Sequence, residues 1–188
     1  MSRHILAAGL IISVAYAAVH IAFADATLLT GAAPLRLSVR NYLGNVLGSG
    51  MVWGIFSYLM GKDFPGRWLK ALLAGTGIIV MMLAVHYTLL VVFGVYNWCE
   101  AFEYNAQWFF LALLSGPVLG LAGAASARFC WFDYLAVLGF LLEPVVAGLV
   151  PGNSYLPRTT TIPGYFAAAT LWLIGAGFFI WQRRRSTR

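Results

Sequence analysis

Residues 133–152 read DYLAVLGFLLEPVVAGLVPG, a run in which Glu143 is the one charge after the opening aspartate. Roughly 20 apolar residues are enough to cross a bilayer, so this run predicts a transmembrane helix. A carboxylate in hydrocarbon is costly, and such a residue is normally paired, protonated or turned toward a cavity. The surroundings of Glu143 are therefore the first question about function.

The whole chain has the composition of a membrane protein. Of its 188 residues, 61% are hydrophobic and 10% are charged, which lies outside the range of soluble globular domains. We expect an all-α bundle of six transmembrane helices, near residues 5–24, 42–61, 71–95, 106–127, 131–150 and 163–182. The connections are short, so the sequence predicts a single transmembrane domain over residues 1–188.

The first apolar segment has a second interpretation. It follows a short basic start and ends in AFADA at residues 22–26, which resembles a signal peptide with its small-residue cleavage site. Its apolar stretch is longer than a usual signal core. We therefore favour a retained first helix.

The basic residues are unevenly divided by this arrangement. Cytoplasmic loops of membrane proteins are enriched in Lys and Arg, and a cytoplasmic N-terminus places nine of the 12 basic residues inside: Arg3, Lys62, Arg67, Lys70, Arg128, Arg183, Arg184, Arg185 and Arg188. We predict that both termini are cytoplasmic and that the protein crosses a cell membrane, the inner or plasma membrane of a bacterium. The net charge of +6 then reflects topology, and we predict no nucleic-acid partner.

Polar residues gather in the outer half of the predicted bundle. At 1.5 Å per residue, Glu143 and His86 lie at similar depths below the outer ends of their helices. Arg40, Asn41 and Asn45 lie at the outer end of the second helix. This asymmetry predicts a polar pocket that opens outward, with Glu143 at its floor and His86 or Arg40 as its main partner.

An aromatic loop follows the third predicted helix. Residues 96–108 read YNWCEAFEYNAQW, and Trp98, Tyr104 and Trp108 alternate there with Glu100 and Glu103. Ring faces and carboxylates suit a flat or cationic ligand. Aromatic residues also collect at membrane interfaces without any ligand, so both interpretations stay open. A second outer loop, GNSYLPRTTTI at residues 152–162, is a candidate lid.

Three functions are compatible with these residues. In the first, the protein binds a small organic solute and helps to transport it, through Glu143, His86, Tyr87, Arg40, Asn41, Asn45, Trp98, Glu100, Glu103, Tyr104 and Trp108. In the second, it is an intramembrane enzyme acting on a lipid-soluble substrate such as an isoprenoid, as a cyclase or isomerase with Glu143 as acid and His86 as base. There, Trp53, Tyr87 and Trp108 would stabilise a cation. In the third, it is an accessory subunit in which Glu143 is paired with Arg40, His20, His86 or backbone groups.

Known catalytic and metal-binding motifs are missing from the sequence. It contains no H-E-x-x-H, G-x-S-x-G or P-loop pattern, and it has two cysteines at opposite predicted sides of the membrane. We predict no metal and no cofactor. The expected partners are the lipid bilayer, the small-molecule ligand or lipid-soluble substrate, and either a membrane coupling subunit or a second copy of the chain.

The overall layout resembles a known transporter component. Six helices, cytoplasmic termini, the small-residue stretch AAGLIISVAYA at residues 7–17 and the polar outer half look like the substrate-binding subunit of energy-coupling-factor vitamin transporters. The resemblance covers the whole length in layout. It implies a ligand in the outer half under the loops, and a coupling subunit contacted by the small residues of the first helix.

Three further stretches resemble a second group of proteins. Residues 41–61, NYLGNVLGSGMVWGIFSYLMG, residues 116–128, GPVLGLAGAASAR, and residues 141–144, LLEP, are similar to a family of small actinobacterial membrane proteins of unknown role. This similarity implies a related fold and carries no function.

Overall fold

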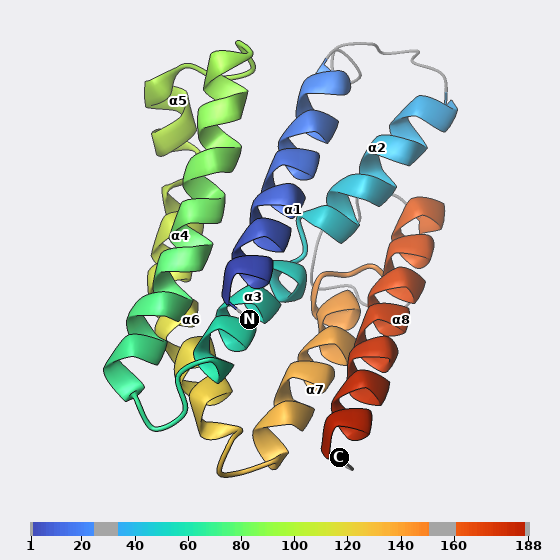
Figure 1. The fold of residues 1–188 in the computed structure, drawn as a ribbon. Helices are drawn as coiled ribbons and strands as arrows, with labels where there is room; N and C mark the ends of the chain where they lie inside the picture. The colour runs from blue at the N-terminus through green and yellow to red at the C-terminus, as the bar shows by residue number, and fades with distance from the viewer. Residues whose placement is uncertain (1, 25–33, 151–160, 187–188) are drawn as a thin grey trace.

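A computed structural model describes residues 2–24, 34–150 and 161–186, and all regular structure in those ranges is helical (Figure 1). The prediction of an all-α fold is confirmed. The helices in chain order are α1 Ser2–Ala22, α2 Pro34–Leu47, α3 Gly50–Lys62, α4 Trp68–Val92, α5 Trp98–Glu103, α6 Ala106–Ala125, α7 Trp131–Val146 and α8 Thr161–Ser186. In Figure 1, α1 rises from the N-terminus and α8 descends to the C-terminus.

Within the described residues, five helices are long and apolar enough to cross a membrane. They are Ser2–Ala22, Leu35–Lys62, Trp68–Val92, Ala106–Ala125 and Ile162–Arg184. The second of these ranges covers α2 and α3 together. Helix α7, with 16 residues, is shorter than each of the five ranges and is not one of them. The apolar helices indicate a membrane protein.

Two predicted helices end earlier than expected, each at a glycine. The expected ends were residues 95 and 150, but α4 ends at Val92 and α7 ends at Val146. Gly94 and Gly148 have positive φ angles of 73° and 69°, which a residue without a side chain adopts at little cost. In the second case the N–H of Leu149 donates to Pro144 at 2.8 Å and that of Gly148 to Val145 at 3.1 Å, which is a Schellman termination.

The second predicted helix, residues 42–61, is wrong in its start and in its continuity. The helical segment begins at Pro34, inside the stretch expected to be a loop, and it is interrupted between Leu47 and Gly50. The interruption falls on Gly48 and Ser49, residue types that favour helix ends over helix interiors. The chain therefore crosses this region as two half-helices, α2 and α3.

Helices α3, α4 and α6 form the most tightly packed part of the molecule. A Cβ atom added at Gly75 would lie 2.7 Å from the Cα of Gly120, and one added at Gly116 would lie 2.7 Å from the Cα of Thr76. Backbones approach this closely only where side chains are small. The hydroxyl of Ser57 adds a cross-link by donating to the Gly116 carbonyl at 2.8 Å.

The small-residue stripe of α1 also packs inside the molecule. Gly9, Ser13 and Ala17 are buried, and the Ser13 hydroxyl donates to the Met82 carbonyl of α4 at 2.5 Å. Intramolecular packing thus accounts for this stripe.

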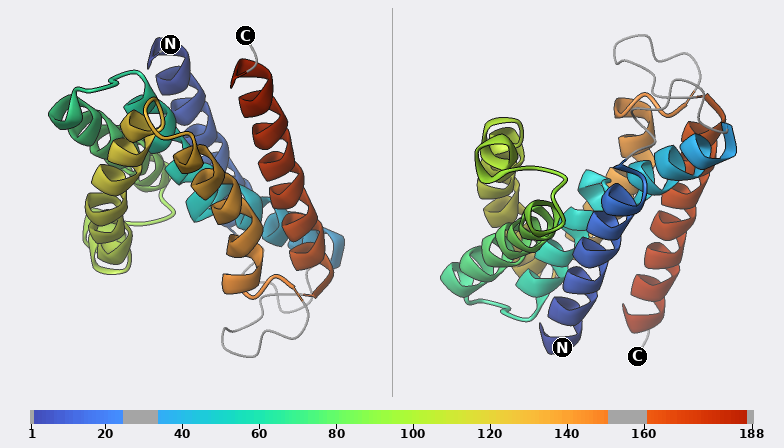
Figure 2. Two further views of the ribbon diagram at one scale, coloured as in Figure 1. Left: turned by 90° about the horizontal axis from the view of Figure 1, so that it is seen from below. Right: turned by 90° about the horizontal axis from the view of Figure 1, so that it is seen from above.

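Helices α2, α7 and α8 form a second group beside this core. Helix α7 packs chiefly on α8 and only lightly on α6, and the left view of Figure 2 shows α7 and α8 running side by side. Within this group the hydroxyls of Tyr42 and Thr170 lie 3.0 Å apart. The largest set of aromatic and histidine side chains around a cavity lies among α1, α3, α4 and α6 and not in this second group.

Candidate functional site: a histidine cavity beside a broken helix

The break between α2 and α3 is closed by side chains. The indole N–H of Trp53 donates to the Leu47 carbonyl at 2.6 Å, which satisfies an acceptor left over at the end of α2. The Ser49 hydroxyl accepts from the N–H of Val52 at 3.2 Å as the N-cap of α3. Lipid cannot satisfy exposed backbone groups, and here these side chains provide the hydrogen bonds that the interrupted helix needs.

Glu143 completes this cap from α7. Its Oε1 accepts from the N–H of Gly50 at 2.5 Å. Its Oε2 accepts from the Ser49 hydroxyl at 2.5 Å and from the N–H of Met51 at 3.0 Å. A helix N-terminus carries partial positive charge and unpaired donors, so it compensates a carboxylate without any cationic side chain.

The predicted partners of Glu143 are therefore wrong. His86 and Arg40 were expected to hold the carboxylate, and the structure instead gives it the backbone of α3 and Ser49. Backbone groups were one of the alternatives for an accessory role. Both oxygens of Glu143 therefore accept hydrogen bonds in the cap of α3.

A cavity of about 460 Å³ lies between α1, α3, α4 and α6. We call it the histidine cavity, because His20 and His86 line it together with a set of aromatic, polar and small residues: Tyr16, Gly48, Gly50, Met51, Trp53, Gly54, Ile79, Leu83, Tyr87, Tyr96, Asn105, Trp108, Leu111, Ala112, Ser115 and Leu119. Gly50 joins it to the broken helix. A Cβ atom added at Gly50 would lie 3.4 Å from Oε1 of Glu143, so the carboxylate stands behind the cavity wall.

Aromatic rings pack around His86 at one side of the cavity. The Tyr16 ring stacks on the imidazole at a centroid distance of 4.6 Å, and the rings of His20 and Trp53 meet it edge-on at 5.4 and 6.0 Å. His86 is 2% exposed. Its Nδ1 has no hydrogen-bond partner in the described part of the chain, and a buried polar atom without a partner is costly.

The predicted site residues fall into three places. His86, Tyr87 and Trp108 line the histidine cavity. Arg40, Asn41 and Asn45 lie on α2 and are not among its lining residues, and the side-chain amide of Asn45 is buried without a partner in the described residues. Trp98, Glu100, Glu103 and Tyr104 lie on or next to α5, outside the cavity.

The α5 residues have local roles or face outward. Glu100 forms a capping box with Asn97: the Glu100 carboxylate accepts from the Asn97 N–H, and the Asn97 side chain accepts from the Glu100 N–H, each at 2.9 Å. Glu103, Tyr104 and Trp98 are exposed. Trp98 lines a separate hollow of about 130 Å³ with Phe102 and Phe109. The candidate lid at residues 152–162 lies almost wholly outside the described residues.

Sequence reasoning missed part of the cavity. Tyr16 and Asn105 line it without having been predicted, and Tyr96, His20 and Trp53 were considered but not included among the predicted ligand-binding residues. One signal was present for α1, because Tyr16 and His20 are four residues apart and so share a helix face. Tyr96 and Asn105 belong to the aromatic loop, where the spacing does not separate cavity residues from exposed ones.

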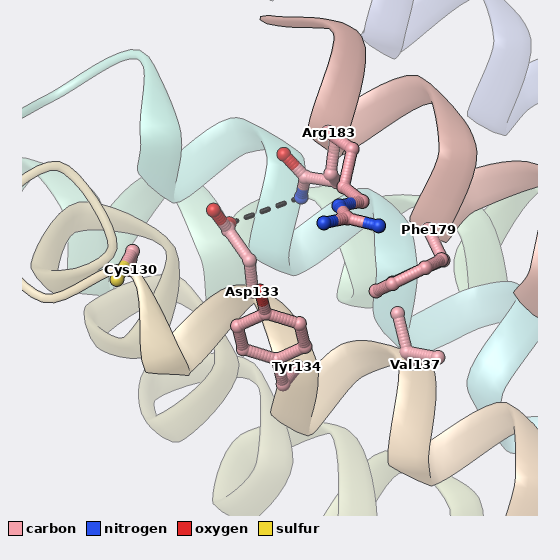
Figure 3. Close-up of a pocket in the computed structure, with 7 residues that line it drawn as sticks. Cys130, Asp133, Tyr134, Val137, Phe179 and Arg183 are labelled. Carbon is pink, nitrogen blue, oxygen red and sulfur yellow. Dashed lines mark hydrogen bonds between the residues drawn. The ribbon is translucent and has the colours of Figure 1, made fainter. Parts of the chain in front are cut away.

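A second polar cluster lies at the opposite end of α3. Lys62 of α3 pairs with Asp133 of α7 at 2.7 Å and donates to Gln182 of α8 at 3.0 Å. The Tyr58 hydroxyl also donates to Asp133. Figure 3 shows Asp133 with a dashed line for the hydrogen bond that it accepts from Gln182 at 3.0 Å. The hollow beside it is only about 50 Å³, so this cluster joins three helices and offers little room for a ligand.

No protein-family model, curated protein or solved structure matches the chain. No group of three or more His, Cys, Asp or Glu side chains in residues 2–24, 34–150 and 161–186 could hold a metal ion.

Proposed function

We propose that this protein is an integral membrane protein that binds a small organic solute in the histidine cavity and assists its transport across the bilayer. One observation carries the proposal. His86 is buried in the wall of a cavity of about 460 Å³, and its Nδ1 lacks a partner in the described residues. Ligand sites combine an apolar, aromatic lining with a few polar groups, and a ligand that displaces one of the rings packed on His86 would supply the missing hydrogen bond.

The proposed topology has six crossings with both termini in the cytoplasm. In it, α2 and α3 together make one crossing, and α7 makes another. The 16 residues of α7 span about 24 Å at 1.5 Å per residue, against a hydrocarbon core of about 30 Å. Short spans are accommodated by local thinning of the bilayer at modest cost. The excess of Lys and Arg on the predicted inner side supports this orientation.

The broken helix supports a ligand role as well. Discontinuous membrane helices expose backbone groups next to binding sites in many transporters, and here Gly48 and Gly50 at the break line the cavity. Glu143 holds the first turn of α3 in place. A coupling subunit or a second copy remains a proposed partner. It would dock on a face other than the α1 stripe, which α4 covers.

The test is to identify what travels with the purified protein. Organic and aqueous extracts of the wild type, His86→Leu and the exposed-site control Glu103→Gln are compared by mass spectrometry. We expect one molecule in near-stoichiometric amount in the wild type and control, reduced at least tenfold in His86→Leu. The same bulk phospholipid in all three samples would contradict the proposal.

An intramembrane acid–base enzyme is the second candidate, favoured by one arrangement. His20 and His86 lie side by side with the phenol rings of Tyr16 and Tyr87, so groups that transfer protons and ring faces that stabilise cations share one cavity. Because Glu143 is engaged in the cap, this chemistry would rest on His86 and the tyrosines. An enzyme predicts two related molecules, substrate and product, in the wild-type extract and only the substrate in His86→Leu.

A further inference from the structure

We propose, resting on the function above, that the ligand is a neutral amphiphile with a hydrogen-bonding ring headgroup in the histidine cavity and an apolar chain in a groove between α6 and α7. This α6–α7 groove, of about 540 Å³, is lined by Met51, Tyr58, Trp68, Val118, Leu119, Leu121, Ala122, Ala125, Phe129, Phe132, Leu135 and Ala136. A prenylated quinone is the chemical class that fits both parts.

The α6–α7 groove has the chemistry of a site for hydrocarbon. Its one hydroxyl belongs to Tyr58 and already donates to Asp133. The remaining lining is aliphatic or aromatic, apart from the indole N–H of Trp68. A polar ligand group placed there would lose its water and find almost no partner, whereas an apolar chain loses nothing.

The groove and the histidine cavity adjoin each other. Met51 and Leu119 line both, and on α6 the lining runs from Trp108 in the cavity to Ala125 in the groove. That stretch of helix is about 26 Å long at 1.5 Å per residue. Met51 reaches α7, because a Cβ atom added at Gly139 would lie 2.5 Å from its Sδ. A flexible thioether at the junction can adapt to a chain passing beside it.

The headgroup is expected to be uncharged. None of the residues that line the histidine cavity is Asp, Glu, Lys or Arg, although the aromatic loop had suggested a flat or cationic ligand. Arg40, Glu100 and Glu103 are not in the lining, and the charge of Glu143 is compensated by α3. A buried ion without a counter-charge is strongly disfavoured. This argues against a phospholipid headgroup as well as against a free ion.

A flat ring with an oxygen substituent matches the remaining features. Tyr16, Trp53 and Trp108 provide ring surfaces, against which another ring packs in an offset or edge-on arrangement. His86 Nδ1 is a buried polar atom of the cavity wall that has no partner in the described residues. As a donor it would bond a quinone carbonyl, and in the other tautomer it would accept from a quinol hydroxyl.

The experiment compares two probes that differ only in the chain. Duroquinone is a fully methylated benzoquinone, and the second probe replaces one methyl group with a prenyl chain. Full substitution prevents addition to the exposed thiols of Cys99 and Cys130. The full-length protein is placed in nanodiscs, and binding to empty nanodiscs is subtracted so that partition into lipid does not count.

Four variants distinguish binding of the headgroup in the histidine cavity from binding of the prenyl chain in the α6–α7 groove. His86→Leu alters the cavity, and Ala122→Phe and Leu135→Trp narrow the groove. Leu138→Trp is the matched control, because Leu138 lies on α7 with 46% exposure, against 45% for Leu135, and does not line the groove. Leu135 is exposed, so a larger side chain there does not disturb the packed interior. Thermal unfolding of each variant checks that folding is retained.

We expect the prenylated probe to bind the wild type and Leu138→Trp at least tenfold more tightly than duroquinone. The groove variants should bring that ratio close to one and leave duroquinone binding unchanged, whereas His86→Leu should weaken both probes. An unchanged ratio in both groove variants would overturn the chain site and leave a solute site at His86 standing. Binding of neither probe would overturn the quinone class, while the extraction experiment still decides whether the cavity holds any solute.

Discussion

The two ends of α3 are both held by carboxylates of α7, but in different ways. At the N-terminal end, Glu143 accepts from two peptide N–H groups and the Ser49 hydroxyl. At the C-terminal end, Asp133 accepts from Lys62, Tyr58 and Gln182, all of them side chains. The carboxylates are ten residues apart on α7, about 15 Å along the axis, which nearly matches the length of α3.

The difference lies in what can replace each carboxylate. The partners of Asp133 are side chains, and in the ion pair Lys62 is 20% and Asp133 24% exposed, so water can reach the Lys62 ammonium if the carboxylate is lost. The main partners of Glu143 are backbone donors that exist whatever the sequence. The N-terminal contact also borders the histidine cavity through Gly50. Fewer other groups can therefore take over the hydrogen bonds of the carboxylate at the end of α3 next to the cavity than at the opposite end.

The largest effect is expected for Glu143→Leu. It leaves the N–H groups of Gly50 and Met51 and the Ser49 hydroxyl without their acceptor, and we expect the free energy of unfolding to fall by about 2–4 kcal/mol. Glu143→Gln keeps one acceptor oxygen and should lose about half as much. Denaturation of the purified protein in detergent measures both. Glu103→Leu, at an exposed carboxylate, is the control, and equal losses at the two sites would refute the cap.

Asp133→Leu should cost less. The change removes the shared acceptor of Lys62, Tyr58 and Gln182, but partial exposure lets water reach the Lys62 ammonium. We expect a loss of about 1–3 kcal/mol in the same denaturation measurement. A loss larger than that of Glu143→Leu would reverse the order of the two ends and contradict the comparison.

Much of the fold follows from the sequence, because its signals are local. Runs of apolar residues locate α1, α4, α6 and α8 within a few residues, and the charge pattern suggests the orientation. The break at Gly48 and Ser49 was missed, since the same glycines also suit helix packing. Helices α4 and α7 end next to Gly94 and Gly148, which have positive φ angles. The sequence alone does not show which of its glycines adopt such angles.

The site was less accessible to sequence reasoning for a physical reason. Glu143 and Ser49 are 94 residues apart, and no periodicity within one helix predicts which helix end a distant carboxylate meets. Depth along the bilayer placed His86 and Glu143 near one level, and both do border the region of the first turn of α3. The depth of a residue does not show which way its side chain faces around the helix axis. For this reason the predicted pairing between His86 and Glu143 was wrong.

A double variant sharpens the contrast at the C-terminal end. Removing both charges of a pair is usually far less costly than removing one, because no ion is left without its partner. We expect Lys62→Met combined with Asp133→Leu to recover about 1 kcal/mol of the loss caused by Asp133→Leu alone. A double-mutant cycle measures this coupling. Additive losses would mean that Lys62 contributes nothing through Asp133.

The smallest expected effect separates the hydroxyl from the carboxylate at the N-terminal end. Ser49→Ala removes the acceptor of the Val52 N–H and one donor to Glu143, and N-cap substitutions of this kind cost about 1 kcal/mol. Ser49→Thr retains the hydroxyl and should stay within about 0.5 kcal/mol of the wild type, which makes it the matched control. If Ser49→Ala lowers the free energy of unfolding as much as Glu143→Leu does, the Ser49 hydroxyl provides most of the stabilisation at this helix end. The hydrogen bonds from the Gly50 and Met51 N–H groups to the carboxylate would then contribute little. If Ser49→Ala costs about 1 kcal/mol, Glu143 holds α3 mainly through its backbone, and the wall of the histidine cavity at Gly50 depends on α7.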